Sequence, residues 1–142
     1  MENFHLYVPI LVRYGDLDPQ WHVNNAKFLT FLEQSRVAYL QHLELWDGRD
    51  FFQIGLIVAD IHVAYLLPIA LGQELRVGIR VAHLGNKSMR FEYQIEGAQG
   101  SPVFARAETV MVSYDYLAQS SRTIPEDWRT KIAAFEGIAP RS

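Results

Sequence analysis

Alternation of apolar and polar residues dominates the second half of the chain. In segment 74–84, apolar residues at positions 75, 77, 79 and 81 oppose charged residues at 74, 76 and 80. Segment 88–97 repeats this period of two, and segment 103–115 is one more long run. A period of two predicts β-strands that bury one face. We therefore expect three consecutive strands, joined by turns at Gly85-Asn86 and at 97–102.

Two further strands are predicted in the first half of the chain. Residues 7–14 form an apolar run that contains Pro9. Because proline has no N–H to donate to a neighbouring strand, this strand is expected at an edge of the sheet. Residues 55–68 form a long apolar strand that Pro68 ends or interrupts.

Between these two strands the pattern becomes helical from Ala26. One side of the helix carries Phe28, Phe31, Leu32, Ser35, Ala38 and Tyr39, and the other carries Lys27, Thr30, Gln34 and Gln41. Asn24 or Asn25 is suited to cap its N-terminus. A second, short helix is predicted within 124–137, with Pro125 at its first position and Gly137 as its stop.

The order of elements is one strand, one long helix, four strands and a short helix. This order predicts an α+β fold in which a five-stranded antiparallel sheet wraps around one central helix. The 142 residues fit a single domain, 1–142. A sheet with open edges and one uncovered face favours a homodimer or a homotetramer.

Composition and charge exclude several classes of function. The chain has no cysteine, so it has no disulfide, no thiolate nucleophile and no cysteine-based zinc site. Its net charge is −3 with scattered Lys and Arg, which argues against a nucleic-acid partner. No two of its five histidines have the i, i+4 spacing of a helical metal site, so we expect no metal and no cofactor. We expect no membrane span and, with no signal-like N-terminus, a cytoplasmic protein.

A polar segment, DLDPQWHVNN, joins the first strand to the hydrophobic helix at residues 16–25. The wider stretch 13–36, RYGDLDPQWHVNNAKFLTFLEQSR, resembles the signature of hotdog-fold acyl-CoA thioesterases of the 4-hydroxybenzoyl-CoA thioesterase type. The resemblance extends over nearly the whole chain, from Tyr7 to Pro125. It implies the hotdog fold and hydrolysis of an acyl-CoA to a free acid and CoA.

The resemblance also implies roles for two residues. Asp18 matches the catalytic carboxylate, acting as nucleophile or as general base for water. The backbone N–H of about Asn25 matches the donor that holds the thioester oxygen. Both roles suit the chemistry, because a helix N-terminus offers free N–H groups to a developing oxyanion. From local sequence alone, Asp18 before Pro19 is a common turn former, and aspartates in such loops are more often structural than catalytic.

Several other residues are candidates with structural alternatives. His22 could orient Asp18 or the substrate, or bond to the loop backbone. Asn24 is a candidate for substrate binding or for capping the helix. Glu33 could approach the site or a partner subunit, or pair with Arg36 one turn on. Asp16 is expected to support the loop or to pair with Arg13.

The CoA tail has its own candidates, because phosphates favour cationic side chains and loop N–H groups. They are Tyr65, Asn86, Lys87, Ser88 and Arg90. Lys87 and Arg90 could equally be solvated hairpin charges. Trp21 stands where relatives commonly have glycine, which leaves the acyl preference open. The alternatives to an acyl-CoA thioesterase are an acyl-ACP thioesterase, another hotdog acyl-thioester enzyme, or a non-catalytic acyl-CoA-binding protein.

Overall fold

The computed structural model describes residues 4–50 and 53–141. Along these residues the elements are β1 (Leu6–Leu11), a 3-10 turn (Tyr14–Asp16), α1 (Asn25–His42), β2 (Leu56–Tyr65), β3 (Glu74–Leu84), β4 (Ser88–Gly97), β5 (Val103–Asp115), β6 (Ser120–Ser121) and α2 (Glu126–Glu136). Five long strands, one long helix and a short C-terminal helix confirm the predicted α+β fold. The two-residue strand β6 is an addition that the sequence pattern did not predict.

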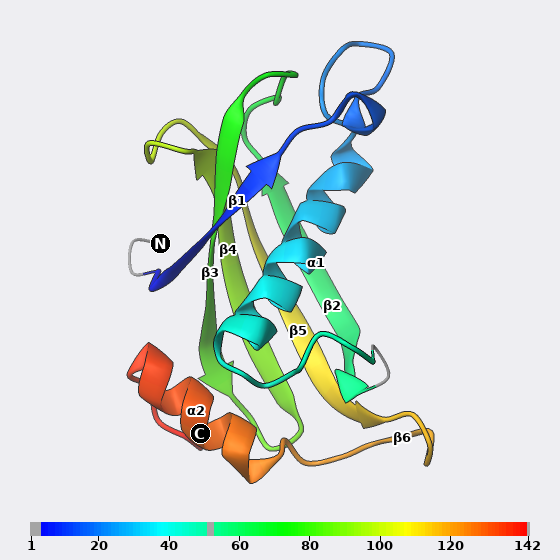
Figure 1. The fold of residues 1–142 in the computed structure, drawn as a ribbon, viewed down its shortest axis with the longest axis vertical. Coiled ribbons are helices and arrows are strands. Elements are labelled where there is room, and N and C mark those ends of the chain that lie inside the picture. Colours follow the sequence, from blue (N-terminus) through cyan, green and yellow to red (C-terminus); the bar gives the residue numbers. More distant parts are fainter. Residues whose placement is uncertain (1–3, 51–52, 142) are drawn as a thin grey trace.

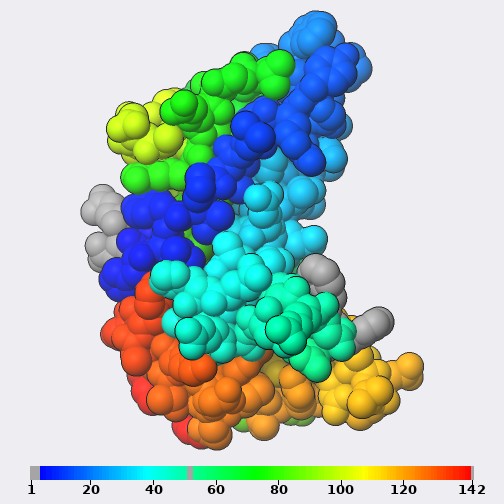
Figure 2. Space-filling view, viewed as in Figure 1, coloured from blue at the N-terminus to red at the C-terminus, as the bar shows by residue number. Residues whose placement is uncertain are grey.

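The sheet is antiparallel throughout, with strand order β1-β3-β4-β5-β2 and with β6 beside β5. The two edge strands are β1 and β2, and Pro9 lies in β1 as expected. Helix α1 lies across one face of the sheet, and α2 covers one end of it (Figure 1). The loop that precedes α1 and the helix α2 are therefore at opposite ends of the molecule (Figure 2).

The core lies between α1 and the inner face of the sheet. The strands contribute the alternating residues that the sequence predicted, and each is at most 2% exposed: Leu75, Val77, Ile79, Val81, Met89, Phe91, Tyr93 and Ile95. The helix contributes Phe28, Phe31, Leu32, Ser35, Tyr39 and Leu40. Arg36 is also buried on this face, although its charge suggested a solvated position.

Strand β2 carries a β-bulge that changes which residues face the helix. Val58 pairs with Met111 and Asp60 with Val110, so Ala59 is an extra residue without a partner on β5. Side chains alternate along a strand, so one extra residue reverses the phase of everything after it. Consequently Val58 before the bulge and Ile61 after it both lie over the inner face.

A buried carboxylate joins α2 to the rest of the core. Glu136 Oε2 accepts hydrogen bonds from the Tyr39 hydroxyl at 2.7 Å and from the Val81 N–H at 2.9 Å. Val81 lies at a second bulge, in β3, so the carboxylate satisfies a backbone donor where the ladder is irregular. Burial and the nearby Glu136 charge raise the pKa of Tyr39.

Helix ends follow the expected chemistry to within one residue. Asn24 is the N-cap of α1, and its side-chain oxygen accepts from the Ala26 N–H at 2.9 Å. Pro125 is the N-cap of α2 rather than its first residue, and Gly137 ends α2 with φ of 68°. Neither helix of the described chain is long and apolar enough to cross a membrane.

Candidate active site

The loop before α1 holds Asp18 by one carboxylate oxygen. Asp18 Oδ1 accepts from the Gln20 N–H at 2.9 Å and from the His22 N–H at 3.3 Å. The Asp18 N–H donates to the His22 carbonyl at 2.8 Å, so residues 18–22 close a tight turn. Within the described residues, Oδ2 of Asp18 receives no hydrogen bond. The carboxylate is thus fixed by one oxygen and has the other available.

Trp21 completes this turn in an unusual backbone conformation. Its φ is +65°, in the left-handed region that side chains other than glycine seldom adopt. Its ring is 64% exposed and contacts Tyr14 edge to face, with centroids 6.3 Å apart. The other charge of the loop, Asp16, is buried and pairs with Arg13 as predicted, with Oδ2 accepting the Arg13 N–H at 2.9 Å.

The first turn of α1 leaves one donor free beside this carboxylate. The side chain and the carbonyl of Asn24 accept from Ala26 and Lys27, which satisfies two N–H groups of the helix start. The Asn25 N–H, at the first helical position, donates to no group in the described part of the chain. A free N–H at the positive end of a helix dipole is suited to hold an anionic oxygen.

A small pocket of about 290 Å³ brings the main candidates together. Its polar lining includes Asp18, His22, Asn25 and Tyr65. The Tyr65 hydroxyl donates to the Asn25 carbonyl at 3.0 Å, and the Tyr65 ring contacts Phe28 with centroids 4.9 Å apart. Tyr65 therefore fixes the end of β2 against the start of α1, and residues distant in the sequence form one site.

Other candidates lie outside this pocket. Asn24 is engaged as the helix cap, so its side chain has the structural role. Glu33 is 74% exposed at its side chain, two turns further along α1, with Oε2 3.9 Å from Arg36 Nη2. Both of the alternatives stated for Glu33 thus remain, with the Arg36 pairing present but long.

The hairpin candidates lie at the opposite end of the sheet. Ser88 pairs with Val112 on β5, whereas Tyr65 pairs with Ala105. Seven residues of strand separate these two points, which is about 23 Å. Arg90 is held by Glu92 at 3.1 Å and lies 3.6 Å from Glu108. Within one chain, then, Asn86, Lys87, Ser88 and Arg90 do not meet Asp18.

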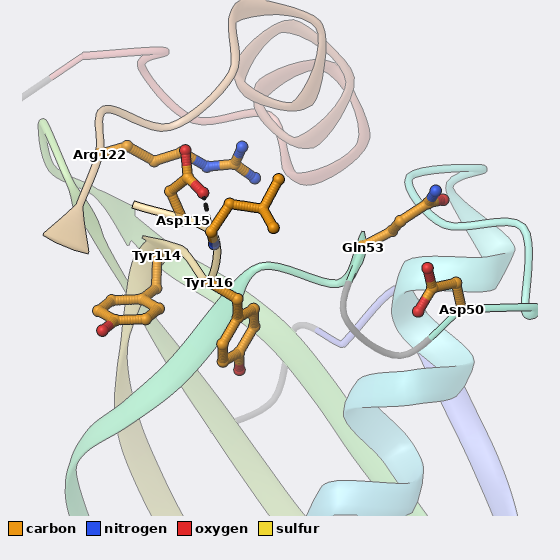
Figure 3. A pocket seen from close by; sticks show the side chains of 7 residues that line it. Asp50, Gln53, Tyr114, Asp115, Tyr116 and Arg122 are labelled. Carbon is orange, nitrogen blue, oxygen red and sulfur yellow. Dashed lines mark hydrogen bonds between the residues drawn. The ribbon is translucent and has the colours of Figure 1, made fainter. Parts of the chain in front are cut away.

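A larger cavity of about 660 Å³ lies where β5 turns toward β6 (Figure 3). Its lining residues are Asp50, Gln53, Tyr114, Asp115, Tyr116, Leu117 and Arg122. Asp115 Oδ1 is already engaged by the N–H groups of Leu117 and Ala118 at 2.9 and 3.1 Å. None of the described residues that line this cavity begins a helix. The smaller pocket is therefore the better candidate for chemistry, despite its size.

The arrangement suits attack on a polarised carbonyl. Oδ2 of Asp18 is available to attack a carbonyl carbon or to take a proton from water. The Asn25 N–H is placed to stabilise the oxygen that becomes negative. Among the described residues, no group of three or more His, Asp or Glu side chains is placed to hold a metal ion.

The sequence matches a known family over most of its length. The family profile of the thioesterase-like superfamily matches residues 12–132. The chain therefore belongs to this superfamily, and the resemblance to hotdog acyl-CoA thioesterases is confirmed.

Individual relatives agree with this assignment. A thioesterase from Thermus thermophilus, solved with coenzyme A and zinc, is 36% identical, with a TM-score of 0.84 over 98% of this chain and 99% of that one. The long-chain acyl-CoA thioesterase FadM of Escherichia coli K12 is 28% identical over 87% of this chain and 93% of that protein. These likenesses confirm the hotdog fold and the expectation of a thioester hydrolase.

A more distant structure shows how widely the fold is shared. A 1,4-dihydroxy-2-naphthoyl-CoA thioesterase from Synechocystis has a TM-score of 0.80 at 19% identity, covering 89% of this chain and 94% of that one. At this identity the likeness concerns the fold alone.

Sequence reasoning missed part of the pocket wall. Leu66, Leu67 and Pro68 line it beside Tyr65, after the end of β2. Their only signal was the proline that interrupts an apolar run. The Val23 N–H donates to the Ile69 carbonyl at 2.7 Å, a contact that connects this segment to the loop that contains Asp18.

Proposed function

We propose that this protein hydrolyses acyl-CoA thioesters with Asp18 as nucleophile or general base and the Asn25 N–H as oxyanion donor. The observation that carries the proposal is the half-engaged carboxylate of Asp18 in the same pocket as the free N–H of α1. The carboxylate supplies the attacking oxygen or removes a proton from water. The thiolate of CoA is a good leaving group, so no strong general acid is needed.

His22 and Tyr65 support this chemistry in different ways. His22 lines the pocket and its backbone holds Asp18, so it positions the carboxylate whatever its imidazole does. Tyr65 anchors the carbonyl of Asn25 and thereby the first turn of α1, to which the donor N–H belongs. Both residues are proposed as positioning groups.

A second copy of the chain is proposed to add along the free edge of β2. This edge exposes Val58, Ile61 and Tyr65 to 43, 39 and 45%. Exposed apolar edge strands favour pairing with another chain. Antiparallel pairing of two β2 strands would bring the 85–88 turn of one copy to the end of the sheet that holds Asp18 in the other.

That arrangement would give the hairpin candidates a role in binding the CoA tail. Lys87 is exposed and makes only a long hydrogen bond, 3.5 Å from its Nζ to Ser121 Oγ. It is therefore available to a phosphate. A homodimer is the smallest assembly that meets this requirement, and a homotetramer would preserve it. The cytoplasmic location expected from the sequence stays a prediction.

Release of free CoA tests the catalytic proposal directly. We expect a panel of short, medium, long and aromatic acyl-CoAs to contain substrates, and Asp18→Asn to lower kcat by about 100- to 10,000-fold. Asparagine keeps an oxygen for the Gln20 and His22 N–H groups, so the loop should persist. The absence of cysteine makes a thiol reagent free of protein background.

Asp47→Asn is the matched control for this variant. Asp47 Oδ1 also accepts an N–H two residues on, from Arg49 at 2.9 Å, in an exposed loop. Its kcat should equal that of the parent protein. Full activity in Asp18→Asn would show that the carboxylate was misassigned. Binding of acyl-CoA without turnover would favour a binding protein or an enzyme specific for acyl-ACP.

A further inference from the structure

A second small pocket is lined by residues of α1 and β2, further from the loop that contains Asp18. It has a volume of about 190 Å³ and opens beside the free edge of β2. Its walls are aliphatic: Val37, Leu40, Ile54, Leu56, Val58 and Met111. Glu33 and Arg36 are the two charged residues that line it. For scale, an apolar cavity of about 150 Å³ accepts a benzene ring.

Arg36 brings a buried cation to this apolar pocket. The residue is 8% exposed, and its Nη1 donates to the Tyr93 hydroxyl at 3.1 Å. The Glu33 carboxylate is beyond hydrogen-bonding distance, at 3.9 Å from Nη2, and its side chain is 74% exposed. Arg36 therefore has no hydrogen-bonded carboxylate within the described residues.

The guanidinium is held in place from the sheet side. Tyr93 is fully buried, and its hydroxyl lies 2.6 Å from Thr109 Oγ1. Burial raises the pKa of Tyr93, so its hydroxyl stays protonated and can pass its hydrogen bond on to Thr109. This chain of bonds fixes one edge of the guanidinium and directs the rest of it away from the sheet.

The remaining donors of Arg36 reach the pocket. Among the fully buried side-chain nitrogen and oxygen atoms of the described residues, only Arg129 Nε lacks a hydrogen-bond partner. The nitrogens of Arg36 that make no hydrogen bond are not among these fully buried atoms. They are therefore accessible from the pocket that Arg36 lines. A guanidinium at an apolar wall is best satisfied by an oxygen acceptor, most strongly by a carboxylate.

The distance from the active site suits an acyl chain. Asn25 and Arg36 are separated by 11 residues of one helix, which is about 16 Å. Between them, Leu29 on α1 and Ile61 on β2 are 37% and 39% exposed and offer apolar contacts to such a chain. An extended chain of medium length would reach from the thioester to the guanidinium.

We propose that Arg36 selects acyl groups carrying an oxygen acceptor, such as a carboxylate, at the end remote from the thioester. The proposal rests on the thioesterase function above and deepens it by naming the substrate class. The chain lies against the aliphatic wall, its far end enters the second pocket, and its terminal oxygens accept from Arg36. Glu33 stays turned toward solvent and does not compete.

The test compares two substrates of equal length, dodecanoyl-CoA and its counterpart with a terminal carboxylate. We expect the carboxylate to raise kcat/KM by about 10- to 100-fold, the effect of a charge-assisted hydrogen bond in a partly buried site. Arg36→Met should remove this preference, while Arg36→Lys keeps part of it. Arg106→Met removes a cation from the exposed outer face of the sheet and should preserve the full preference.

A second variant tests the pocket if Arg36→Met does not fold. Val58→Trp fills the pocket from β2 and leaves Arg36 in place, and because Val58 lies on the edge proposed to pair with a second copy, the oligomeric state of this variant is compared with that of the parent protein. It should shift the optimum toward shorter acyl chains and abolish the preference for the terminal carboxylate. Thermal unfolding of each variant identifies any loss of fold.

The remaining outcomes distinguish the proposed role of Arg36 from the proposed thioesterase function. Hydrolysis of both substrates with equal efficiency, or an equal loss for both in Arg36→Met, overturns the role of Arg36 and leaves the thioesterase function intact. Hydrolysis of no acyl-CoA overturns the proposed function itself. A change in oligomeric state in Arg36→Met with unchanged preference shows instead that a second copy of the chain fills the pocket.

Discussion

Two carboxylates near the two ends of α1 differ in how completely they are bonded. At the C-terminal half, Glu136 is 9% exposed, and its Oε2 accepts from Tyr39 and Val81 while Oε1 lies 3.5 Å from His5 Nδ1. At the N-terminal end, Asp18 has one oxygen engaged by backbone N–H groups and the other open to a pocket. The first carboxylate stabilises the fold, and the second is available for reaction.

The comparison shows why burial alone does not identify a candidate for a catalytic carboxylate. Glu136 is the more buried group, but every nearby donor is directed at it and leaves no room for a substrate. Asp18 is less buried and less satisfied, and it lies beside an N–H that has no partner among the described residues. The proposal of Asp18 as the reactive carboxylate rests on an oxygen without a hydrogen bond next to an N–H without a hydrogen bond, within the described residues.

The largest expected effect is a loss of activity when the Asn25 N–H, the proposed oxyanion donor, is removed. Asn25→Pro deletes the N–H at the first helical position, where proline is well tolerated. The preceding residue, Asn24, already has φ of −58° and ψ of 135°, which suits a following proline. We expect kcat for acyl-CoA hydrolysis to fall by about 100- to 1,000-fold without loss of helix.

Two comparisons isolate that donor from the side chain and from helix stability. Asn25→Ala keeps the N–H and should retain most activity. Glu126→Pro makes the same change at the first position of α2, after a residue with ψ of 140°, and should leave kcat unchanged. Equal losses in Asn25→Ala and Asn25→Pro would assign the effect to the asparagine side chain.

The next largest expected effect is a loss of stability when the carboxylate of Glu136 is replaced. Glu136→Gln removes the charge that Tyr39 and Val81 hydrogen-bond, so we expect the free energy of unfolding to fall by about 2 kcal/mol. Glu126→Gln, an exposed partner of Arg141, should change it by less than about 0.5 kcal/mol. Urea unfolding measures both variants. If Glu136→Gln instead lowered kcat at unchanged stability, the contrast between the two carboxylates would be lost.

The smallest effect is a dependence of stability on alkaline pH. The pKa of Tyr39 is raised by burial and by Glu136, so the unfolded chain loses this proton at lower pH than the folded chain. Stability from this group is complete below about pH 10 and falls above it, by up to about 1.4 kcal/mol per pH unit. Tyr39→Phe should make the decline shallower in urea unfolding between about pH 9 and pH 11. Identical slopes would show that Tyr39 ionises normally in the folded state.

Much of the fold was predictable because its signals are local. The alternation at 75, 77, 79 and 81, the cap at Asn24 and the stop at Gly137 each depend on a few neighbouring residues. Strand β2 was harder: every residue from Leu56 to Ala59 is apolar, so the alternation that begins at Asp60 has no earlier alternation against which a change of phase could be seen. Arg36 was also missed, because burying a guanidinium depends on Tyr93, far away in the sequence.

The residues of the candidate site also differ in whether local sequence could group them. Asp18, His22 and Asn25 lie within eight residues, so sequence alone could group them. Tyr65 was a candidate for the CoA tail, and its bond to the Asn25 carbonyl depends on how β2 lies against α1. Asn86, Lys87, Ser88 and Arg90 were candidates because phosphates favour cationic side chains and loop N–H groups, and their distance from Asp18 follows from sheet register, which no local pattern encodes.

The extra residue in β2 has an evolutionary consequence. Residues beyond the bulge keep the partners that a regular strand would give them, because Val58 pairs with Met111 and Asp60 with the next residue, Val110. A single-codon deletion at Ala59 would therefore leave Ile61, Val63 and Tyr65 on the face that they occupy now and would remove only the local irregularity. A relative without this residue would keep the same side chains over α1, although its sequence would align with this one only across a one-residue gap.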